Sequence, residues 1–365
     1  MQKKQLPRNV TLILPVAGKS ERFGKKIPKW LLATPNNNLM ISESISKLDV
    51  SLVKEIILIC IKDHIKKFIS IENIKKSIQS NLKRKVKIRV CVLNKILSSQ
   101  AHTISAGIKK MNINGPIFIK DCDNYFEYKI RKGNIVNVLN LNNANLVLAK
   151  NKSYIEIDKK RIVLRIIEKK VISDLFCTGG YGFESGKTFL ETFNKIYKEN
   201  NNIGEIYVSH VIQKMILENH KFEAEEVENY IDFGTYDEWK KYTDKFISII
   251  TEVDGIFFKK GSKYLNNKWS YEIIKNNMET LLEINKNKKL NFTIITNRPK
   301  SHKNKIERIF NSWGIKINNF ISDQPLMTSI TIRDFDPKNT YGKSISINIP
   351  SNSIEFSEYI RNLTN

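Results

Sequence analysis

The sequence lacks an apolar run long enough to cross a membrane as a helix. It has 365 residues, of which 41% are hydrophobic, but its apolar runs, such as Ile56–Ile61, have the length of a strand. A membrane-spanning helix needs about 18 or more such residues. The first residues, MQKKQLPRNV, carry basic side chains with no apolar stretch behind them, which is not the pattern of a secretory signal. We therefore expect a cytoplasmic protein with no membrane insertion.

Cysteine and histidine are too few and too scattered for a zinc site. No two of the four cysteines and five histidines have the paired spacing typical of zinc ligands. Buried, reduced thiols in a cytoplasmic protein are the simplest interpretation of the cysteines.

Acidic residues are outnumbered by basic ones, 37 Asp and Glu against 61 Lys and Arg, and the formal net charge is +24. Such a charge can serve nucleic-acid or anionic-membrane binding. The lysines are spread along the whole chain, however, with no dense basic block and no aromatic ladder beside one. We interpret the positive charge as a general compositional bias toward lysine and expect no nucleic-acid partner. A positive field would still help to capture phosphorylated substrates.

The chain length favours two domains. In the first part, short apolar runs alternate with helical patterns at 40–48, about 62–82 and 102–111. The runs read as strands at Val10–Val16, Glu55–Ile61, Val86–Leu93 and Pro116–Lys120. This alternation predicts an α/β fold with a mixed, mostly parallel sheet covered on both faces.

The same alternation restarts at Phe246. A strand at Phe246–Ile250 is followed by a helical pattern at about 271–288, a strand at Phe292–Thr296 and a helical pattern at 301–312. There is no internal repeat and no flexible spacer. We expect a first domain of residues 1–245 and a smaller α/β domain of residues 246–365.

A loop of small and basic residues follows the first strand. Residues 14–24 read LPVAGKSERFG, and Pro28-Lys29 follows. Small residues let backbone N–H groups approach a phosphate or a base edge closely, and Arg22 and Lys29 add two cations that can neutralise a polyphosphate. The spacing is that of neither a P-loop nor a dinucleotide-binding GxGxxG turn. An ordinary strand-to-helix loop with solvated cations is the alternative.

Acidic residues occur at two further points. Asp121 and Asp123 follow the strand that ends at Lys120, where α/β sheets bind ligands. Two carboxylates suit Mg²⁺, which keeps most of its waters and bridges phosphates. The alternative is an aspartate that caps a turn or a helix. Asp232 opens the step Asp232-Phe233-Gly234-Thr235, where Thr235 could also cap a helix.

In this order, the segments resemble those of nucleotidyltransferases with a GT-A-like fold. This family includes the sugar-1-phosphate nucleotidylyltransferases and the cytidylyltransferase of isoprenoid synthesis. Its pattern is a strand, then Ala/Gly-x-Gly-x-x-Arg and, a few residues later, Pro-Lys. Gly18, Arg22, Pro28 and Lys29 match it, whereas Ser20 stands where the family usually has its second glycine.

The resemblance implies a role for each matching residue. Arg22 and Lys29 would grip the triphosphate and stabilise charge at the α-phosphate. The nucleotide would also contact Pro15, Val16, Ala17, Gly18, Lys19 and, at the base, Gln100. The Mg²⁺ ligands would be Asp123, within a Gly-Asp-Asn-like step, and Asp232, with Asp121 as a substitute. Lys169 would contact the sugar phosphate, Gly180 the sugar, and Glu205 the sugar hydroxyls.

Residues 246–365 resemble a haloacid dehalogenase-like (HAD-like) domain of the kind found beside polysaccharide-synthesis enzymes. That family's Asp-x-Asp-Gly step is here Glu252-Val253-Asp254-Gly255. Glutamate at the nucleophile position displaces the attacking oxygen by about 1 Å or more, which can cost orders of magnitude in rate. Thr296 matches the phosphate-binding hydroxyl and Asp334 the acidic metal motif, but we find no counterpart of the third-motif lysine. We predict a degenerate domain with a structural or ligand-sensing role.

Three functions follow. The first is a nucleotidyltransferase that joins a nucleoside monophosphate to a sugar phosphate, serving capsule or surface polysaccharide synthesis by family analogy alone. The second is a bifunctional transferase and phosphatase. The third is a nucleotide-sugar-binding or glycosyltransferase-like protein without pyrophosphate chemistry. A homo-oligomer is compatible with each.

Overall fold

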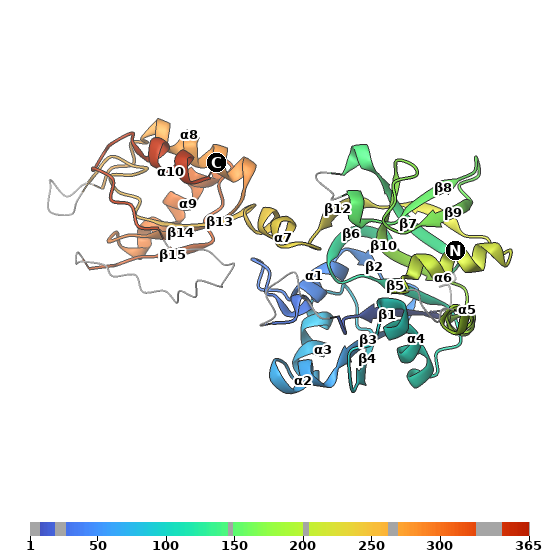
Figure 1. Cartoon of the computed structure of the whole chain (residues 1–365). Helices are drawn as coiled ribbons and strands as arrows, with labels where there is room; N and C mark the ends of the chain where they lie inside the picture. The colour runs from blue at the N-terminus through green and yellow to red at the C-terminus, as the bar shows by residue number, and fades with distance from the viewer. Residues whose placement is uncertain are drawn as a thin grey trace, which may run out of the picture. The chain divides into compact units, whose positions relative to one another are not determined.

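Figure 1 shows a computed structural model of the chain, which describes residues 8–18, 27–144, 149–199, 204–261, 269–325 and 345–364. The chain divides into two compact units, Met1–Trp239 and Lys240–Asn365. The division falls within helix α7 (Tyr236–Thr243). Among the described residues, no helix is both long enough and apolar enough to cross a membrane.

A nine-stranded mixed sheet forms the centre of the first unit, and its main path runs β11-β7-β10-β5-β1-β3-β4. Its parallel half consists of β1 (Val10–Pro15), β3 (Val53–Ile61), β4 (Lys87–Leu93) and β5 (Ile117–Lys120). In this half β1 pairs with both β3 and β5, and β3 pairs with β4. These strands are rich in buried Ile, Val and Leu because helices cover both faces. The predicted α/β fold with a mostly parallel sheet is confirmed for this unit.

The antiparallel strand β10 makes the sheet mixed. It lies between β5 and β7 and pairs antiparallel with both, while β11 lies parallel to β7 at the edge. This half of the sheet comprises β7 (Ile135–Asn140), β8 (Tyr154–Ile157), β9 (Val163–Ile167), β10 (Leu175–Phe183) and β11 (Glu223–Glu226).

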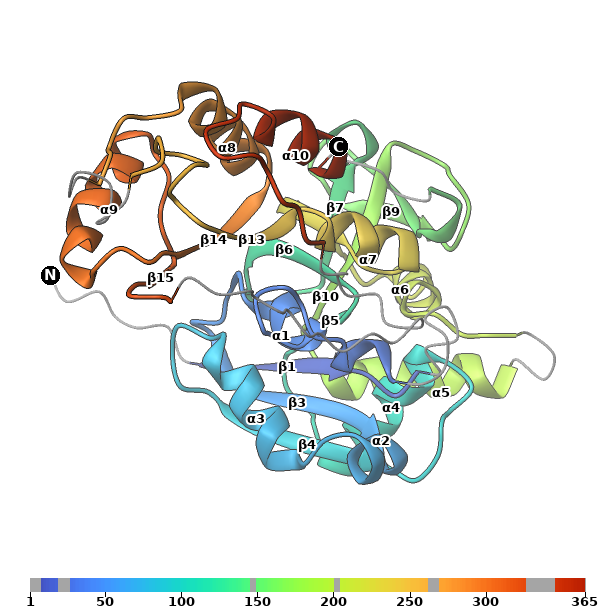
Figure 2. The same ribbon diagram turned by 90° about the vertical axis from the view of Figure 1, so that its left-hand side faces the viewer.

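Helices lie on both faces of the sheet (Figures 1 and 2). Ile57 and Ile59 share a core with α4 (Gln100–Met111), α5 (Gly186–Glu199) and α6 (Val208–Leu217). Their neighbours Ile56 and Leu58 face the other way, because side chains alternate along a strand. On that face lie α1 (Met40–Ile45), α2 (Lys62–Lys67) and α3 (Ile71–Ser80).

The single helix predicted over about 62–82 is wrong, because the chain forms α2 and α3 there. Helix α2 ends at Lys67, with Phe68 as its C-cap. Ser70 then begins α3: its side chain accepts a hydrogen bond from Asn73 N at 3.2 Å, as an N-cap does. Short 3-10 turns occur at Lys29–Leu31 (η2), Leu141–Asn143 (η3), Ala149–Asn151 (η4) and Lys300–His302 (η5).

A separate small sheet of the first unit joins segments that are far apart in the sequence. Its order is β12-β6-β2, with β2 (Leu48–Asp49), β6 (Asn124–Lys129) and β12 (Glu228–Asp232). Strands β6 and β12 run antiparallel, and Asp232 pairs with Asn124. The pairing places the two acidic segments identified in the sequence side by side.

The second unit is built on three parallel strands in the order β13-β14-β15. They are β13 (Phe246–Thr251), β14 (Lys289–Ile295) and β15 (Asn319–Ile321); helices α8 (Lys275–Asn287) and α9 (Lys303–Ser312) connect them, and α10 (Phe356–Thr364) follows. Phe257, Phe292 and Phe310 pack together at the core. The unit is therefore α/β, as its sequence pattern predicts.

A substitution at Gly107 of α4 tests how this helix packs against the sheet. A β-carbon there would lie 2.2 Å from Cδ1 of the wholly buried Ile59. We expect Gly107→Ala to lower the free energy of unfolding by about 1–3 kcal/mol through overpacking, although alanine favours a helix. Gly115→Ala is the control, because a β-carbon there has no neighbour within 4 Å. Urea unfolding measures both, and a Gly107→Ala protein as stable as the wild type would contradict this packing.

Candidate functional site

A cleft of about 590 Å³ opens at the carboxyl ends of β1 and β5. The starts of α4 and α6 also line it, through Gln100 and Val208. This end of a parallel sheet is where α/β folds bind ligands. Of the site residues proposed from the sequence, those that line the cleft are Pro15, Val16, Ala17, Gly18, Lys29, Gln100, Asp121, Asp123, Lys169, Glu205 and Asp232. Lys19 and Arg22 lie outside the described residues.

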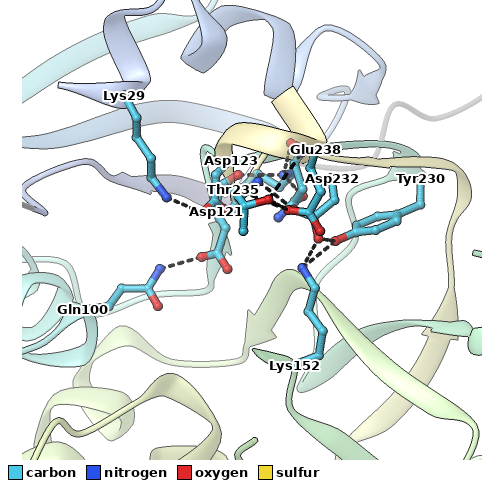
Figure 3. Close-up of polar contacts among 12 residues, drawn as sticks. Lys29, Gln100, Asp121, Asp123, Lys152, Tyr230, Asp232, Thr235 and Glu238 are labelled. Atoms are coloured by element: carbon cyan, nitrogen blue, oxygen red, sulfur yellow. Dashed lines mark hydrogen bonds and ion pairs between the residues drawn. The ribbon is translucent and has the colours of Figure 1, made fainter. Parts of the chain in front are cut away.

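Backbone hydrogen bonds bring the carboxylates of Asp123 and Asp232 together (Figure 3). Phe233 N donates to Asp123 O at 2.8 Å, immediately after the strand pair of β12 and β6. A β-carbon at Gly234 would lie 2.9 Å from Asp232 Oδ1 and 3.8 Å from Asp123 Oδ2. The two carboxylates therefore converge on the same small volume.

The glycine that approaches the acidic loop is Gly179. It has φ +83°, and a β-carbon there would lie 2.6 Å from Asp121 Oδ2 and 2.7 Å from Asn124 Nδ2. Its carbonyl accepts a hydrogen bond from Asp121 N at 2.8 Å. Gly180 is turned away: a β-carbon there would meet Asn137 and Phe126 instead. The structure thus brings Gly179, rather than the proposed Gly180, to the lining of the cleft.

Lys29 and Asp123 form an ion pair in the cleft (Figure 3). Lys29 begins the turn η2, directly after Pro28. Burial alone would raise the pKa of Asp123, but the Lys29 ammonium outweighs it and holds that pKa below its usual range. Burial likewise disfavours the charge on Lys29, yet the attraction of Asp123 raises the pKa of Lys29. Both groups therefore carry charge at neutral pH.

Asp232 has its own lysine, Lys152, which the sequence analysis did not single out. The two form an ion pair, and Lys152 Nζ also donates to Tyr230 OH at 3.0 Å. Asp232 accepts further hydrogen bonds from Tyr230 OH at 3.1 Å and Gly234 N at 2.8 Å. Burial opposes the charge on Lys152, but Tyr230 and Asp232 together raise its pKa well above the ordinary value.

A third lysine, Lys120, lies wholly buried at the end of β5. It donates to Asp121 O at 2.6 Å and to the backbone and side-chain oxygens of Asn124 at 2.9 and 2.5 Å. Its ammonium also lies 4.5 Å from the centre of the Phe126 ring. Burial lowers its pKa to about 8, against the attraction of nearby carboxylates. Lys120 clamps the turn that carries the acidic residues.

Asp121 is held by Gln100, whose Nε2 donates to Asp121 Oδ1 at 2.5 Å. Gln100 is the first residue of α4, after the N-cap Ser99. Burial and the neighbouring charge of Asp123 raise the pKa of Asp121 to about 6. Asp121 and Asp123 are thus adjacent carboxylates whose surroundings move their pKa values in opposite directions.

Lys169 and Glu205 meet through a tyrosine that the sequence analysis did not identify. Lys169, at φ +55°, donates to Tyr207 OH. Tyr207 OH in turn donates to Glu205 Oε2 at 2.6 Å. Beside them, Glu168 accepts hydrogen bonds from the hydroxyls of Ser153 and Ser209. This part of the cleft offers a cation, carboxylates and hydroxyl groups, which suits a polar ligand.

In the second unit, the residues that match the HAD-like motifs differ in their exposure and in their partners. Glu252 is exposed just after β13, while Asp254 forms a two-point ion pair with the wholly buried Arg298, at 2.6 and 2.9 Å. Thr296 is buried, and its Oγ1 accepts from Arg298 N at 3.2 Å. Asp334 lies outside the described residues.

The fold of the first unit is similar to that of solved structures. A nucleoside-diphosphate-sugar pyrophosphorylase from Vibrio cholerae RC9 matches with a TM-score of 0.52 and 18% identity, over 64% of this chain and 99% of that chain. The first unit has a nucleotidyltransferase fold. The inositol-1-phosphate CTP transferase from T. maritima matches with a TM-score of 0.49 and 14% identity, over 65% of this chain and 95% of that chain. No protein-family model and no curated protein matches the chain.

Asp121 makes the stability of this nucleotidyltransferase fold depend on pH. Its pKa is about 6 in the folded chain against an ordinary 3.8, so between these values the folded chain binds a proton that the unfolded chain has lost. Stability from this group therefore falls as pH rises through that window. We expect Asp121→Asn to gain unfolding free energy relative to the wild type from pH 4 to pH 7, by up to about 3 kcal/mol.

Urea unfolding with a chelator present, at pH 4, 5, 6 and 7, measures this difference. Asp237→Asn is the control, because Asp237 is an exposed aspartate of α7. Parallel pH curves for wild type and Asp121→Asn would show that Asp121 does not cause the dependence.

Proposed function

We propose that the first unit transfers a nucleoside monophosphate from a nucleoside triphosphate to a phosphorylated sugar or a similar small molecule, with release of pyrophosphate. The observation that carries this proposal is the convergence of Asp123 and Asp232, with Lys29, at the strand ends of a nucleotidyltransferase fold. The neighbouring structures supply only the fold, and the chemistry is inferred from the side chains.

The residues fit Mg²⁺, which proteins usually hold through one or two carboxylates while waters and substrate phosphates complete the shell. Asp123 and Asp232 would supply those carboxylates. Among the described residues, no three His, Cys, Asp or Glu side chains form a complete metal site, so nucleotide phosphates would be needed as well. The bound cation would neutralise charge on the transferring phosphate.

The remaining residues bind and position the substrates. Lys29 can exchange Asp123 for the triphosphate and stabilise charge that develops at the α-phosphate. The backbone of residues 15–18 lies beside it in the cleft, and Gln100 would contact the base. Arg22 and Lys19 remain predictions of a second cation and a further backbone contact.

The acceptor would occupy the end of the cleft near Lys169 and Glu205. Lys169 would hold its phosphate and Glu205 its hydroxyl groups. An oxygen of that phosphate attacks the α-phosphorus in line, the bond to the β-phosphate bridging oxygen breaks, and pyrophosphate leaves with both electrons. No general base is needed because the attacking phosphate is already anionic. Positioning and charge neutralisation do the catalysis.

Release of pyrophosphate from a matrix of nucleoside triphosphates and sugar 1-phosphates with Mg²⁺ tests this function. We expect one combination to stand out. Asp123→Asn and Asp232→Asn should each reduce its rate on the order of 100-fold or more, because each removes a carboxylate that would hold the cation at the reacting phosphate. The exposed Asp237→Asn should retain the wild-type rate. Binding of a nucleotide sugar with no pyrophosphate released from any pair would instead favour a binding or glycosyltransferase-like protein.

We also propose that the second unit is a HAD-like domain that does not cleave phosphate esters. The supporting observation is that Asp254, the expected acid/base partner, is neutralised by the buried Arg298. Glutamate stands at the nucleophile position beside it. By family analogy alone, the two units would serve the synthesis of a surface polysaccharide.

An aryl phosphate assay tests this second unit. We expect no phosphate release above background from the full chain, and no change in Glu252→Ala, because neither a correctly placed nucleophile nor a free acid is present. Robust release that Glu252→Ala abolishes would establish the bifunctional alternative.

A further inference from the structure

We propose that Lys152 binds the anionic group of the acceptor substrate and that, without acceptor and cation, it neutralises Asp232. The inference rests on the function proposed for this cleft and assigns it a residue that no family motif in the sequence identifies. It begins from the burial of the pair: the side chain of Lys152 is 18% exposed and that of Asp232 only 4%. A carboxylate buried to this degree needs an opposite charge.

Lys152 is built into the cleft in the same way as Lys169. Each ammonium is hydrogen-bonded to a tyrosine hydroxyl, which also contacts a carboxylate: Tyr230 and Asp232 for Lys152, Tyr207 and Glu205 for Lys169. The two segments are joined directly, because Lys169 N donates to Lys152 O at 3.0 Å. Both lysines line the cleft. The acceptor end therefore presents two ammonium groups, which match the double charge of a phosphate monoester.

The position of Lys152 sets it in competition with a cation. Its ammonium contacts Asp232 Oδ2. A metal ion bound to this carboxylate would compete for the same oxygen. Two positive groups on one carboxylate oxygen repel each other, and the four-carbon stem of lysine lets its ammonium move to another anion nearby. The acceptor phosphate is the anion that this end of the cleft receives. Lys152 should thus oppose cation binding in the empty cleft and favour acceptor binding in the loaded one.

Replacement of Lys152 by methionine separates these effects. In the full chain without substrates, we expect Lys152→Met to bind Mn²⁺ several-fold more tightly than the wild type, measured by calorimetry. In the transfer reaction, we expect the KM for the best sugar 1-phosphate to rise about tenfold or more, as loss of a charged hydrogen bond does, while the KM for the nucleotide changes less than twofold. Lys150→Met is the matched control, because Lys150 is an exposed lysine of the adjacent turn η4.

Lys152→Arg keeps the charge and should retain a wild-type Mn²⁺ affinity and most of the acceptor affinity, which also guards against a methionine variant that fails to fold. Unchanged Mn²⁺ affinity and unchanged acceptor KM in folded Lys152→Met would overturn the proposal. A rise in nucleotide KM instead would assign Lys152 to the triphosphate. If the wild type transfers no nucleotide, the proposed function fails, whereas the Mn²⁺ titrations still decide whether Lys152 competes at Asp232.

Discussion

The pairing of β12 with β6 is the constraint on which the site depends. It joins the strand that ends at Asp232 to the strand that begins just after Asp123, and a hydrogen bond from Phe233 N to Asp123 O, at 2.8 Å, extends the pairing. Two carboxylates that are distant in the sequence thereby share one small volume. Without opposite charge beside it, such a cluster would repel itself and destabilise the fold.

Three lysines balance that cluster, and each does so from a different element. Lys29 reaches Asp123 from the turn η2, and Lys152 reaches Asp232 from the segment before β8. Lys120, at the end of β5, donates a hydrogen bond to the backbone of the acidic turn. The substrates of the proposed reaction, a nucleoside triphosphate and a phosphorylated acceptor, are themselves polyanions. A substrate that brings a cation with it can therefore take over the partners of Lys29 and Lys152 without leaving a buried charge uncompensated. The same carboxylates and lysines that neutralise each other in the empty cleft would therefore bind the cation and the phosphates in the proposed reaction.

The sequence was sufficient for the parallel half of the sheet and for most of the cleft lining, and insufficient for the partners of the site residues. Strands such as β1 and β3 are apolar throughout, and loops that follow them lie at one edge of the sheet whatever the details of packing. Strand β12, in contrast, carries Glu228, Asn229 and Tyr230, which give no hydrophobic alternation, so the pairing that joins Asp232 to Asp123 was not predictable.

The sequence did not identify Lys120 and Lys152 as site residues for a different reason. Nothing in the local sequence separates Lys120 and Lys152 from the many exposed lysines, because their burial depends on contacts with Asn124 and Asp232 across the fold. Gly179 and Gly180 are adjacent, and only the positive φ of Gly179 decides which one meets the acidic loop.

The bond that breaks in the nucleotide tests the central claim most directly. With nucleoside triphosphate labelled at the α- or the γ-phosphate, and the sugar phosphate that supports turnover, the account predicts that α-label enters the sugar nucleotide and γ-label leaves as pyrophosphate. Transfer of γ-label to the sugar, or its release as inorganic phosphate, would show that the carboxylates and lysines of this cleft act on a different phosphate and would contradict the account.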